Sequence, residues 1–225
     1  PELIAAKAKG IPASTLTECH EILMRNKKSS AVAGTHGKTT TTAILGFIMQ
    51  QADFDPTVLV GAPIPQFNGS ALVGGSEYFV IEACEYKHKF KQYSPMSLIL
   101  HNIDYDHPDT FSTVDDYVDE FIELAQKVPN FGFIAANVDD ANIQKVLSRV
   151  NVEIIPYGSV PSAEWRIEHD PVGSNIKSQN FFIFHKGNLW AKGETQLHGN
   201  FNLSNILSAV VVAVKFNISQ DIILK

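Results

Sequence analysis

The chain has 225 residues, of which 44% are hydrophobic and 19% charged, so it is long enough to bury a full hydrophobic core. Its net charge of −6 argues against a nucleic-acid-binding surface, and it has no apolar run near the roughly 20 residues that a membrane-spanning helix needs. The two cysteines, Cys19 and Cys84, are too few and too poorly spaced for a disulfide framework or a zinc site, which favours the reducing cytoplasm. We therefore expect a cytoplasmic globular protein with no nucleic-acid partner and no membrane partner.

From residue 29 to about residue 158, apolar runs alternate with helical patterns, which is typical of βαβ units and a largely parallel sheet. The expected strands cover residues 30–33, 57–60, 78–82, 97–101, 131–136 and 152–157. The expected helices cover residues 38–51, 114–127 and 140–149. Ser112 or Thr113 is a possible N-cap of the second helix.

After residue 163 the pattern changes to short runs typical of antiparallel strands, at residues 165–167, 181–184 and 189–191, with a turn at 186–188. The apolar stretch 206–214 is too short to cross a membrane and predicts a buried helix. The expected fold is therefore α/β, with a mostly parallel phosphate-loop sheet flanked by helices and a small antiparallel β extension.

The most informative segment is residues 31–42, AVAGTHGKTTTT, in which an apolar strand enters a glycine loop followed by a lysine and four threonines. The usual phosphate-loop pattern G-x-x-x-x-G-K-[ST] needs a glycine where this chain has valine, so the match is to a shorter form. Gly34 and Gly37 let backbone N–H groups turn toward an anion at the N-terminus of the next helix. Lys38 would reach the β- and γ-phosphates and Thr39 would ligate Mg²⁺. An ordinary glycine-containing turn is the alternative, but it needs neither the lysine nor the hydroxyls in that order.

A carboxylate that could place the metal follows the strand 78–82, because Glu82 lies at the carboxyl end of that strand, where open α/β sheets bind ligands. Oxygen ligands suit Mg²⁺, so a threonine hydroxyl, a glutamate and phosphate oxygens make a sufficient shell. The alternative for Glu82 is a strand-end charge without a ligand. The charges that follow, Glu85 and the lysines of residues 87–91, are mostly expected to be solvated. For His36, inside the loop, a loop-shaping role and a catalytic role both stay open.

A second group of polar residues follows the strand 97–101, in the sequence NIDYDHPD at residues 102–109. It concentrates three carboxylates, an imidazole and an amide in eight residues. A lone histidine is usually structural, but His107 lies beside Asp106 and Asp109 in the expected phosphate cleft, so we favour a second metal site there.

Four segments in this order, at residues 34–42, 82–85, 102–109 and 199–205, resemble the motifs of the Mur ligases, the ATP-dependent amino-acid ligases of bacterial peptidoglycan synthesis. The Thr-His of the loop and the sequence EACE at residues 82–85 resemble the branch that acts on UDP-N-acetylmuramate. The resemblance implies three catalytic residues, Lys38, Glu82 and His107, and three metal ligands, Thr39, Glu82 and His107. It implies that ATP is bound by Gly34, Thr35, His36, Gly37, Lys38, Thr39, Thr40, Asn102, Asn202 and Asn205, the last two at the adenine end.

The resemblance also implies ATP and Mg²⁺ as cofactors and the joining of L-alanine to UDP-N-acetylmuramate through an acyl phosphate. A ligase of the same branch that recycles murein tripeptide is the first alternative, and a catalytically silent nucleotide-binding module is the second. A switch GTPase is a weak alternative, because the chain has no [NT]-K-x-D element to read guanine. The sequence gives no oligomeric state.

Two departures from the family pattern qualify this expectation. Several other branches carry a carbamylated lysine about one helix past the histidine, but residues 119–122, DEFI, contain no lysine, which leaves the second metal site less defined. The family has three domains, and this chain begins with Pro1 rather than Met. We expect residues 1–28 to be the tail of an N-terminal UDP-sugar domain, residues 29–225 to be the central ATP-binding domain, and the C-terminal amino-acid-binding domain to be absent.

Overall fold

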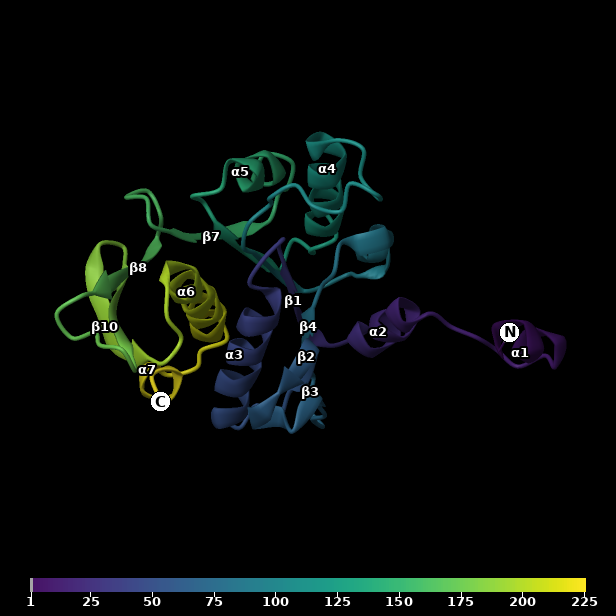
Figure 1. Cartoon of the computed structure of the whole chain (residues 1–225), viewed down its shortest axis with the longest axis horizontal. Coiled ribbons are helices and arrows are strands. Elements are labelled where there is room, and N and C mark those ends of the chain that lie inside the picture. Colours follow the sequence, from purple (N-terminus) through teal and green to yellow (C-terminus); the bar gives the residue numbers. More distant parts are fainter. Residues whose placement is uncertain (1) are drawn as a thin grey trace.

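Ten strands form one sheet with helices on both faces in the computed structural model, which describes residues 2–225 (Figure 1). Pro1 lies outside the described residues. The strands are β1 (Lys28–Ala33), β2 (Thr57–Ile64), β3 (Gly69–Leu72), β4 (Tyr78–Glu82), β5 (Ser97–Leu100), β6 (Phe133–Asn137), β7 (Glu153–Gly158), β8 (Trp165–Asp170), β9 (Gln179–His185) and β10 (Asn188–Thr195). The helices are α1 (Glu2–Ala8), α2 (Leu16–Met24), α3 (Lys38–Gln51), α4 (Val114–Ala125), α5 (Ala141–Leu147), α6 (Asn200–Lys215) and α7 (Gln220–Ile223), with 3₁₀ turns η1 (Pro65–Phe67) and η2 (Tyr86–Gln92).

The strand order is β10-β9-β8-β7-β6-β5-β1-β4-β2-β3. Neighbours from β2 to β8 are parallel, whereas β3 at one edge and β9 and β10 at the other are antiparallel. β1 lies between β4 and β5, so the carboxyl ends of these three strands meet at the middle of one sheet edge. Ligands of open parallel sheets bind at such an edge. The predicted α/β fold with an antiparallel extension is confirmed, and the extension continues the same sheet.

Alternate residues of the central strands enter two separate cores because successive side chains of a strand point to opposite faces of the sheet. Val32 of β1 packs with the apolar sides of α3 and α6. Its neighbours Ala31 and Ala33 pack with α4, α5 and η2 on the other face. Burial on both faces explains why the apolar residues are consecutive at 31–33 of β1 and at 98–100 of β5.

The helices of the central domain begin at local signals in the sequence. α3 follows Gly37, whose φ of 82° is the left-handed conformation that glycine adopts without strain. The Thr113 side chain accepts a hydrogen bond from the Asp116 N–H, so Thr113 rather than Ser112 is the N-cap of α4. Helix α6 begins at Asn200, earlier than the predicted start at residue 206, because its polar first turn has no apolar periodicity. The short strand β3 and the helices α1, α2 and α7 were not predicted.

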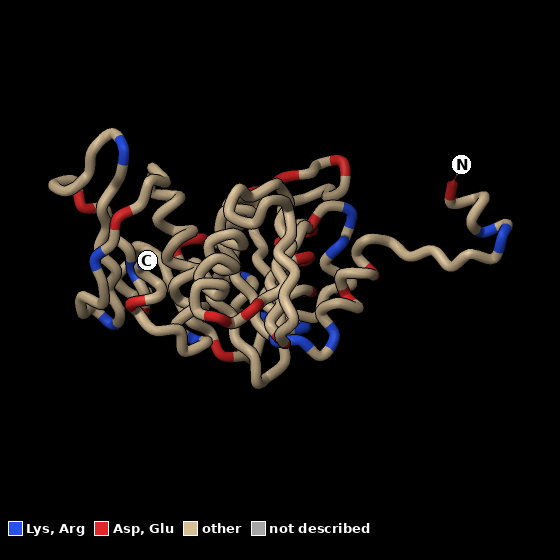
Figure 2. The backbone as a smooth tube through the Cα atoms, turned by 90° about the horizontal axis from the view of Figure 1, so that it is seen from below, with Lys and Arg blue, Asp and Glu red and all other residues tan. Residues whose placement is uncertain are grey.

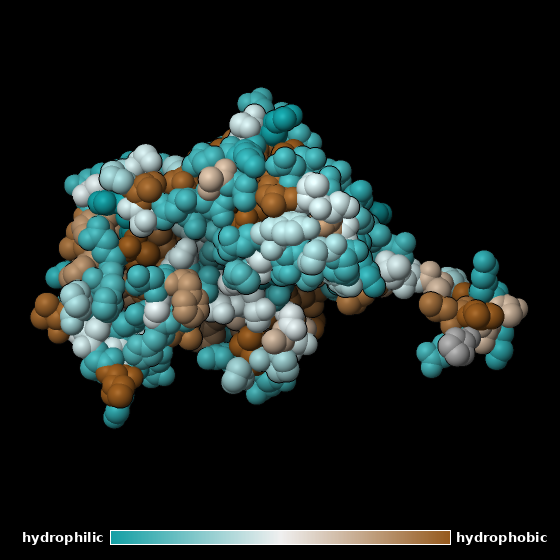
Figure 3. All heavy atoms as spheres, turned by 45° about the horizontal axis from the view of Figure 1, so that its top comes forward, coloured by the Kyte–Doolittle hydropathy of each residue, from teal (hydrophilic) through white to brown (hydrophobic). Residues whose placement is uncertain are grey.

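Of the two N-terminal helices, α1 lies apart from both cores and α2 reaches one of them through its last residue. No described side chain of α1 is buried, and Figure 1 shows this helix standing away from the sheet, beyond α2. Leu3 and Ile4 of α1 are 72% and 76% exposed, and Figure 3 shows apolar side chains gathered on this isolated helix. Met24 at the end of α2 is buried against the core on the α4 face. The assignment of residues 1–28 to a separate domain stays a prediction.

Lysine and arginine residues are scattered among acidic residues along the chain rather than gathered into one stripe (Figure 2). Within residues 2–225, no helix is both long and apolar enough to cross a membrane.

Candidate functional site

The loop between β1 and α3 is shaped by two glycines that lie against other segments of the site. A Cβ atom on Gly34 would lie 2.9 Å from the Cβ of His101 and 3.2 Å from the backbone of Asn102. A Cβ atom on Gly37 would overlap the side-chain oxygen of Asn205 on α6. The loop therefore fits between the end of β5 and the first turns of α6 only because both positions lack a side chain.

Asn102, which follows β5, holds the loop in this conformation. Its backbone oxygen accepts from the Thr35 N–H at 3.0 Å, and its side-chain oxygen accepts from the His36 N–H at 2.8 Å. Its side-chain amide donates to the His36 carbonyl at 3.2 Å. The His36 side chain itself is exposed. The structure thus brings Asn102, a predicted nucleotide-binding residue, to the phosphate loop as a support of its backbone.

Lys38 lies folded back over the loop and is paired with a buried carboxylate. Its ammonium donates to the Gly34 carbonyl at 2.5 Å and to the Thr35 carbonyl at 3.1 Å. The same nitrogen lies 3.2 Å from Oε2 of Glu85, whose side chain is 1% exposed. Glu85 is therefore an exception to the prediction that most charges of this segment are solvated.

Glu85 is buried because η2 and α4 fold over it. The Tyr117 hydroxyl of α4 donates to Glu85 Oε1 at 3.2 Å. Burial raises the pKa of Tyr117, so its hydroxyl keeps the proton that it donates. His107 completes this group, since its Nε2 lies 3.6 Å from Glu85 Oε1 and 3.8 Å from Asp106 Oδ2. The burial of Glu85 could not be predicted from the local sequence, because the helix that packs over it, α4, begins about thirty residues later.

Glu82 has different surroundings from those of Glu85. Its Oε2 accepts from the Gly61 N–H of β2 at 2.8 Å. Both carboxylate oxygens lie where a side chain at position 61 would begin, so the glycine leaves room for them. The structure thus brings Glu85 and His107 to Lys38 and gives Glu82 a partner on the neighbouring strand, and the role of Glu82 as a metal ligand stays a prediction.

The oxygen atoms near Lys38 are the type of ligand that a hard cation such as Mg²⁺ prefers. Glu85 Oε2 is buried without a hydrogen bond, and the Lys38 ammonium 3.2 Å away is its positive partner. If Lys38 turned toward phosphate oxygens, this buried carboxylate would need another cation. Within residues 2–225, no three His, Cys, Asp or Glu side chains are arranged to hold a metal ion by themselves. The residues therefore fit a cation whose remaining ligands are phosphate oxygens and water.

The two asparagines of α6 lie beside the phosphate loop. Asn205 is 3% exposed, and its side-chain amide donates to the Asn202 side-chain oxygen at 3.2 Å. Asn202 in turn donates to the His198 carbonyl at 2.9 Å. A hollow of about 190 Å³ opens next to them, with a lining that includes Gly37, Asn137 and Phe201. Polar amide groups at the edge of a hollow beside a phosphate loop suit the recognition of a nucleotide base.

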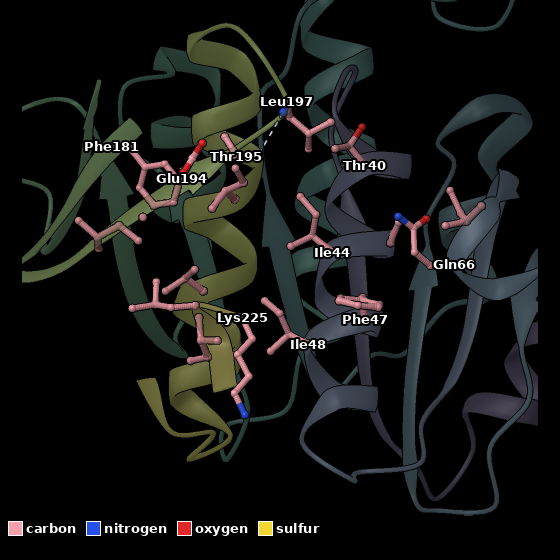
Figure 4. A pocket seen from close by; sticks show the side chains of 18 of the residues that line it. Thr40, Ile44, Phe47, Ile48, Gln66, Phe181, Glu194, Thr195, Leu197 and Lys225 are labelled. Atoms are coloured by element: carbon pink, nitrogen blue, oxygen red, sulfur yellow. Dashed lines mark hydrogen bonds between the residues drawn. The ribbon is translucent and has the colours of Figure 1, made fainter. Parts of the chain in front are cut away.

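A larger groove of about 430 Å³ runs along the outer side of α3 (Figure 4). Ile44, Phe47 and Ile48 of α3 line it opposite Phe181 of β9, and Thr40 stands at its upper end in the view of Figure 4. Its surface is mainly apolar, and the lysine that lines it, Lys225, lies at the end away from Thr40 in Figure 4. The loop and the hollow beside α6 are therefore the candidate nucleotide site.

A glycine loop between a parallel strand and a helix, with a lysine and a buried carboxylate at its mouth, defines a phosphate-loop nucleotide-binding domain of the α/β class. The family model described as "Mur ligase middle domain" matches residues 32–213. The chain therefore belongs to the Mur ligase middle-domain family.

Sequence and structure similarity to known proteins support this family assignment. The chain is 35% identical over 226 aligned residues to the UDP-N-acetylmuramate–L-alanine ligase of Caldicellulosiruptor bescii, and the match covers 98% of this chain and 48% of that protein. The crystal structure of the UDP-N-acetylmuramate:L-alanyl-gamma-D-glutamyl-meso-diaminopimelate ligase from Neisseria meningitides has the same fold, with a TM-score of 0.87, 24% identity, and coverage of 99% of this chain and 72% of that one. The MurF ligase of Thermotoga maritima in complex with ADP has a TM-score of 0.75 and 17% identity, with 94% and 52% covered. The chain spans about half the length of the curated relatives that it matches.

Proposed function

We propose that the protein is an ATP-dependent ligase that joins L-alanine to UDP-N-acetylmuramate, and that this chain supplies its ATP-binding part. The observation that carries the proposal is the buried Glu85 carboxylate beside Lys38 at the mouth of the phosphate loop. The choice of L-alanine is supported by the curated relatives of similar sequence, which are named as L-alanine ligases. The neighbour named for the tripeptide substrate supports the fold alone.

The proposed reaction has two steps in which bonds and charges balance. A carboxylate oxygen of the muramate attacks the γ-phosphorus of ATP, and the bond from that phosphorus to the departing ADP oxygen breaks. The amine of L-alanine then attacks the acyl carbon, inorganic phosphate leaves, and the nitrogen loses a proton as the amide forms. The protein needs no covalent nucleophile for either step, so its contribution is positioning and charge stabilisation.

Lys38 and the glycine loop would bind the phosphates. The ammonium of Lys38 now donates to two loop carbonyls, and phosphate oxygens are stronger acceptors that would draw it toward the β- and γ-phosphates. The N–H groups of the loop and of the first turn of α3 would bind the remaining phosphate oxygens. The phosphate contacts in this proposal are assigned to Gly34, Thr35, His36, Gly37, Lys38, Thr39 and Thr40.

A Mg²⁺ ion bound here would neutralise phosphate charge and polarise the γ-phosphoryl group. The Thr39 hydroxyl and the Glu82 carboxylate are the proposed ligands from the sequence. Glu85 joins them because its buried carboxylate would lose the Lys38 ammonium when that side chain turns to the phosphates. His107, 3.6 Å from Glu85, is the proposed ligand of a second ion. At the other end of the nucleotide, Asn202 and Asn205 would bind the base beside the hollow next to Gly37, while Asn102 would hold the phosphate loop.

The domain assignment and the cellular location belong to the same proposal. Residues 1–28 would be the tail of a UDP-sugar domain, and residues 29–225 the ATP-binding domain. The two cysteines, Cys19 and Cys84, are unpaired, which supports a cytoplasmic reaction. We propose no nucleic-acid or membrane partner.

The test is phosphate release by the full-length protein with MgATP and UDP-N-acetylmuramate, with L-alanine in one reaction and L-alanyl-γ-D-glutamyl-diaminopimelate in another. Turnover with L-alanine alone supports the proposal, and turnover with the tripeptide alone would replace it by the recycling ligase. Turnover with neither would favour a silent nucleotide-binding module.

Two measurements test the site itself. Lys38→Ala should remove most of the ATP affinity, because the loop loses the cation that would bind the phosphates. The variant also leaves the buried Glu85 without its ion-pair partner, so a urea unfolding curve checks that it is folded in the binding assay. Unchanged ATP affinity in this variant would refute the loop assignment. The 225-residue chain alone should bind MgATP weakly and form no amide. Amide formation by that chain would contradict the division of the reaction between domains.

A further inference from the structure

A buried histidine connects the phosphate loop to the helix that carries the two asparagines. His101 follows β5 and is 1% exposed. Its Nε2 lies 2.6 Å from the Thr41 hydroxyl of α3 and 3.1 Å from the Ser208 hydroxyl of α6. Its Nδ1 lies 3.0 Å from the Tyr157 hydroxyl of β7. One imidazole thus joins four elements that are far apart in the sequence.

The partners fix the positions of the protons in this group. Tyr157 donates its hydroxyl proton to the Leu100 carbonyl, so its oxygen accepts from the Nδ1–H of His101. Thr41 donates to Nε2 at 2.6 Å, and the single Ser208 proton is shared between the Asn205 carbonyl at 2.8 Å and Nε2 at 3.1 Å. His101 is then a neutral ring that donates at one nitrogen and accepts at the other. Burial, with a smaller contribution from the Lys38 charge, lowers its pKa to about 3, which keeps it neutral at physiological pH.

His101 also contacts the loop directly. Its backbone N–H donates to the Ala33 carbonyl at the end of β1, and its Cβ lies where a side chain on Gly34 would begin. On the α6 side, the Asn205 carbonyl accepts from Ser208, and the Asn205 side chain faces Gly37. The backbone and Cβ of His101 therefore contact the loop, and its imidazole connects Thr41, in the first turn after the loop, to Ser208 and so to the backbone of Asn205.

Helix α6 needs such a connection because its own start is not capped by a side chain. Gly199 stands at the N-cap with a φ of 95° and supplies no side-chain hydrogen bond to the first turn. The position of Asn205 relative to the loop depends on the packing of α6 against α3, on Gln179, whose side chain donates to and accepts from the Gly199 backbone, and on the polar connection through His101. A nucleotide that contacts both the phosphate loop and Asn205 binds more tightly when the distance between them is already fixed in the free protein.

We propose that His101 is a positioning residue that holds the phosphate loop and the two asparagines of α6 at the separation that a nucleoside triphosphate spans. This inference rests on the proposed nucleotide site. His101 lies beside the hollow next to Gly37, but its ring nitrogens are engaged by Thr41, Ser208 and Tyr157, so it is assigned no hydrogen bond to the nucleotide. The residue acts through Thr41, Ser208 and Gly34.

The experiment compares a ligand that reaches from the phosphate loop to the asparagines of α6 with a ligand that occupies the loop alone. The dissociation constants of MgATP and of magnesium tripolyphosphate are measured by calorimetry for the full-length protein and for His101→Leu. Leucine removes both ring nitrogens, leaving Thr41 and Tyr157 without their partner. We expect MgATP to bind about tenfold more weakly and tripolyphosphate to keep its affinity within about twofold. In His101→Gln an amide oxygen can accept from Thr41, so part of the ATP affinity should return.

Two further variants keep the test valid if His101→Leu does not fold. Thr41→Val removes the hydroxyl without changing the side-chain size and should show the same selective loss for ATP, whereas Thr41→Ser should not. The matched control is Ser97→Ala at the other end of β5, where a buried hydrogen bond of 2.7 Å to Ser30 is lost far from the loop. That control should lower the unfolding temperature and change neither dissociation constant.

Two results would overturn the inference. Equal losses for MgATP and tripolyphosphate would mean that His101 supports only the loop, and unchanged affinities for both would mean that its role is structural. Absence of ATP binding by the unsubstituted protein would refute the proposed function and this inference together. ATP binding that is retained in the unsubstituted protein but insensitive to His101 would refute the inference alone.

Discussion

The stability of the protein should depend on pH through His101. The pKa of this histidine falls from 6.5 to about 3 on folding, first because burial disfavours the charged ring and second because Lys38 lies nearby. Between these two values the unfolded chain binds a proton that the folded chain excludes. The free energy of unfolding is therefore highest above the unfolded pKa and falls as the pH is lowered.

The size of this loss follows from the two pKa values. Between about pH 7.5 and about pH 5, the unfolded histidine becomes almost fully protonated while the folded one stays neutral, which corresponds to about 2 kcal/mol. Urea unfolding at the two pH values measures the loss. His101→Gln carries no titrating ring, so its loss over the same interval should be smaller by about this amount. An equal pH dependence in the two proteins would show that His101 becomes protonated in the folded state and would refute the assignment of its protons.

Three other substitutions test separate parts of the site and fold. Glu85→Gln should raise the Mg²⁺ concentration needed for half-maximal ATP turnover by about tenfold or more, since a carboxylate is a better Mg²⁺ ligand than an amide. An unchanged Mg²⁺ titration would exclude Glu85 from the metal site. Gly37→Ala should reduce ATP affinity, because its φ of 82° costs about 1–2 kcal/mol with a side chain and a Cβ would overlap Asn205. Gly69→Ala, which meets no atom within 4 Å, is the matched control, and equal binding by both variants would contradict the close approach. Thr113→Ala should lower the free energy of unfolding by about 1 kcal/mol in urea, with Thr113→Ser near the original value, because the N-cap of α4 is lost; equal stability of the two would contradict the cap.

Local patterns in the sequence were sufficient for most of the central domain. The predicted helix 38–51 coincides with α3, because a glycine with positive φ, a lysine, hydroxyl residues and an apolar stripe follow one another along the chain. The runs around Trp165, Phe182 and Leu189 likewise give β8, β9 and β10, since the turn between the last two is a local signal. The loop residues of the candidate site were predictable for the same reason.

The burial of Glu85 and the connection through His101 were decided only by the tertiary structure. In the sequence, Glu85 stands beside several lysines and looks like another exposed charged residue. It is buried because Tyr117 of α4 packs over it. His101 meets Thr41 and Ser208 because the sheet order puts β5 next to β1 and the crossing helices put α6 beside α3. The sequence by itself thus determined which residues form the loop, since turn and helix signals act between near neighbours. Which buried polar groups meet around that loop depends on strand order and helix packing, which join residues far apart in the chain and leave no periodic signal in it.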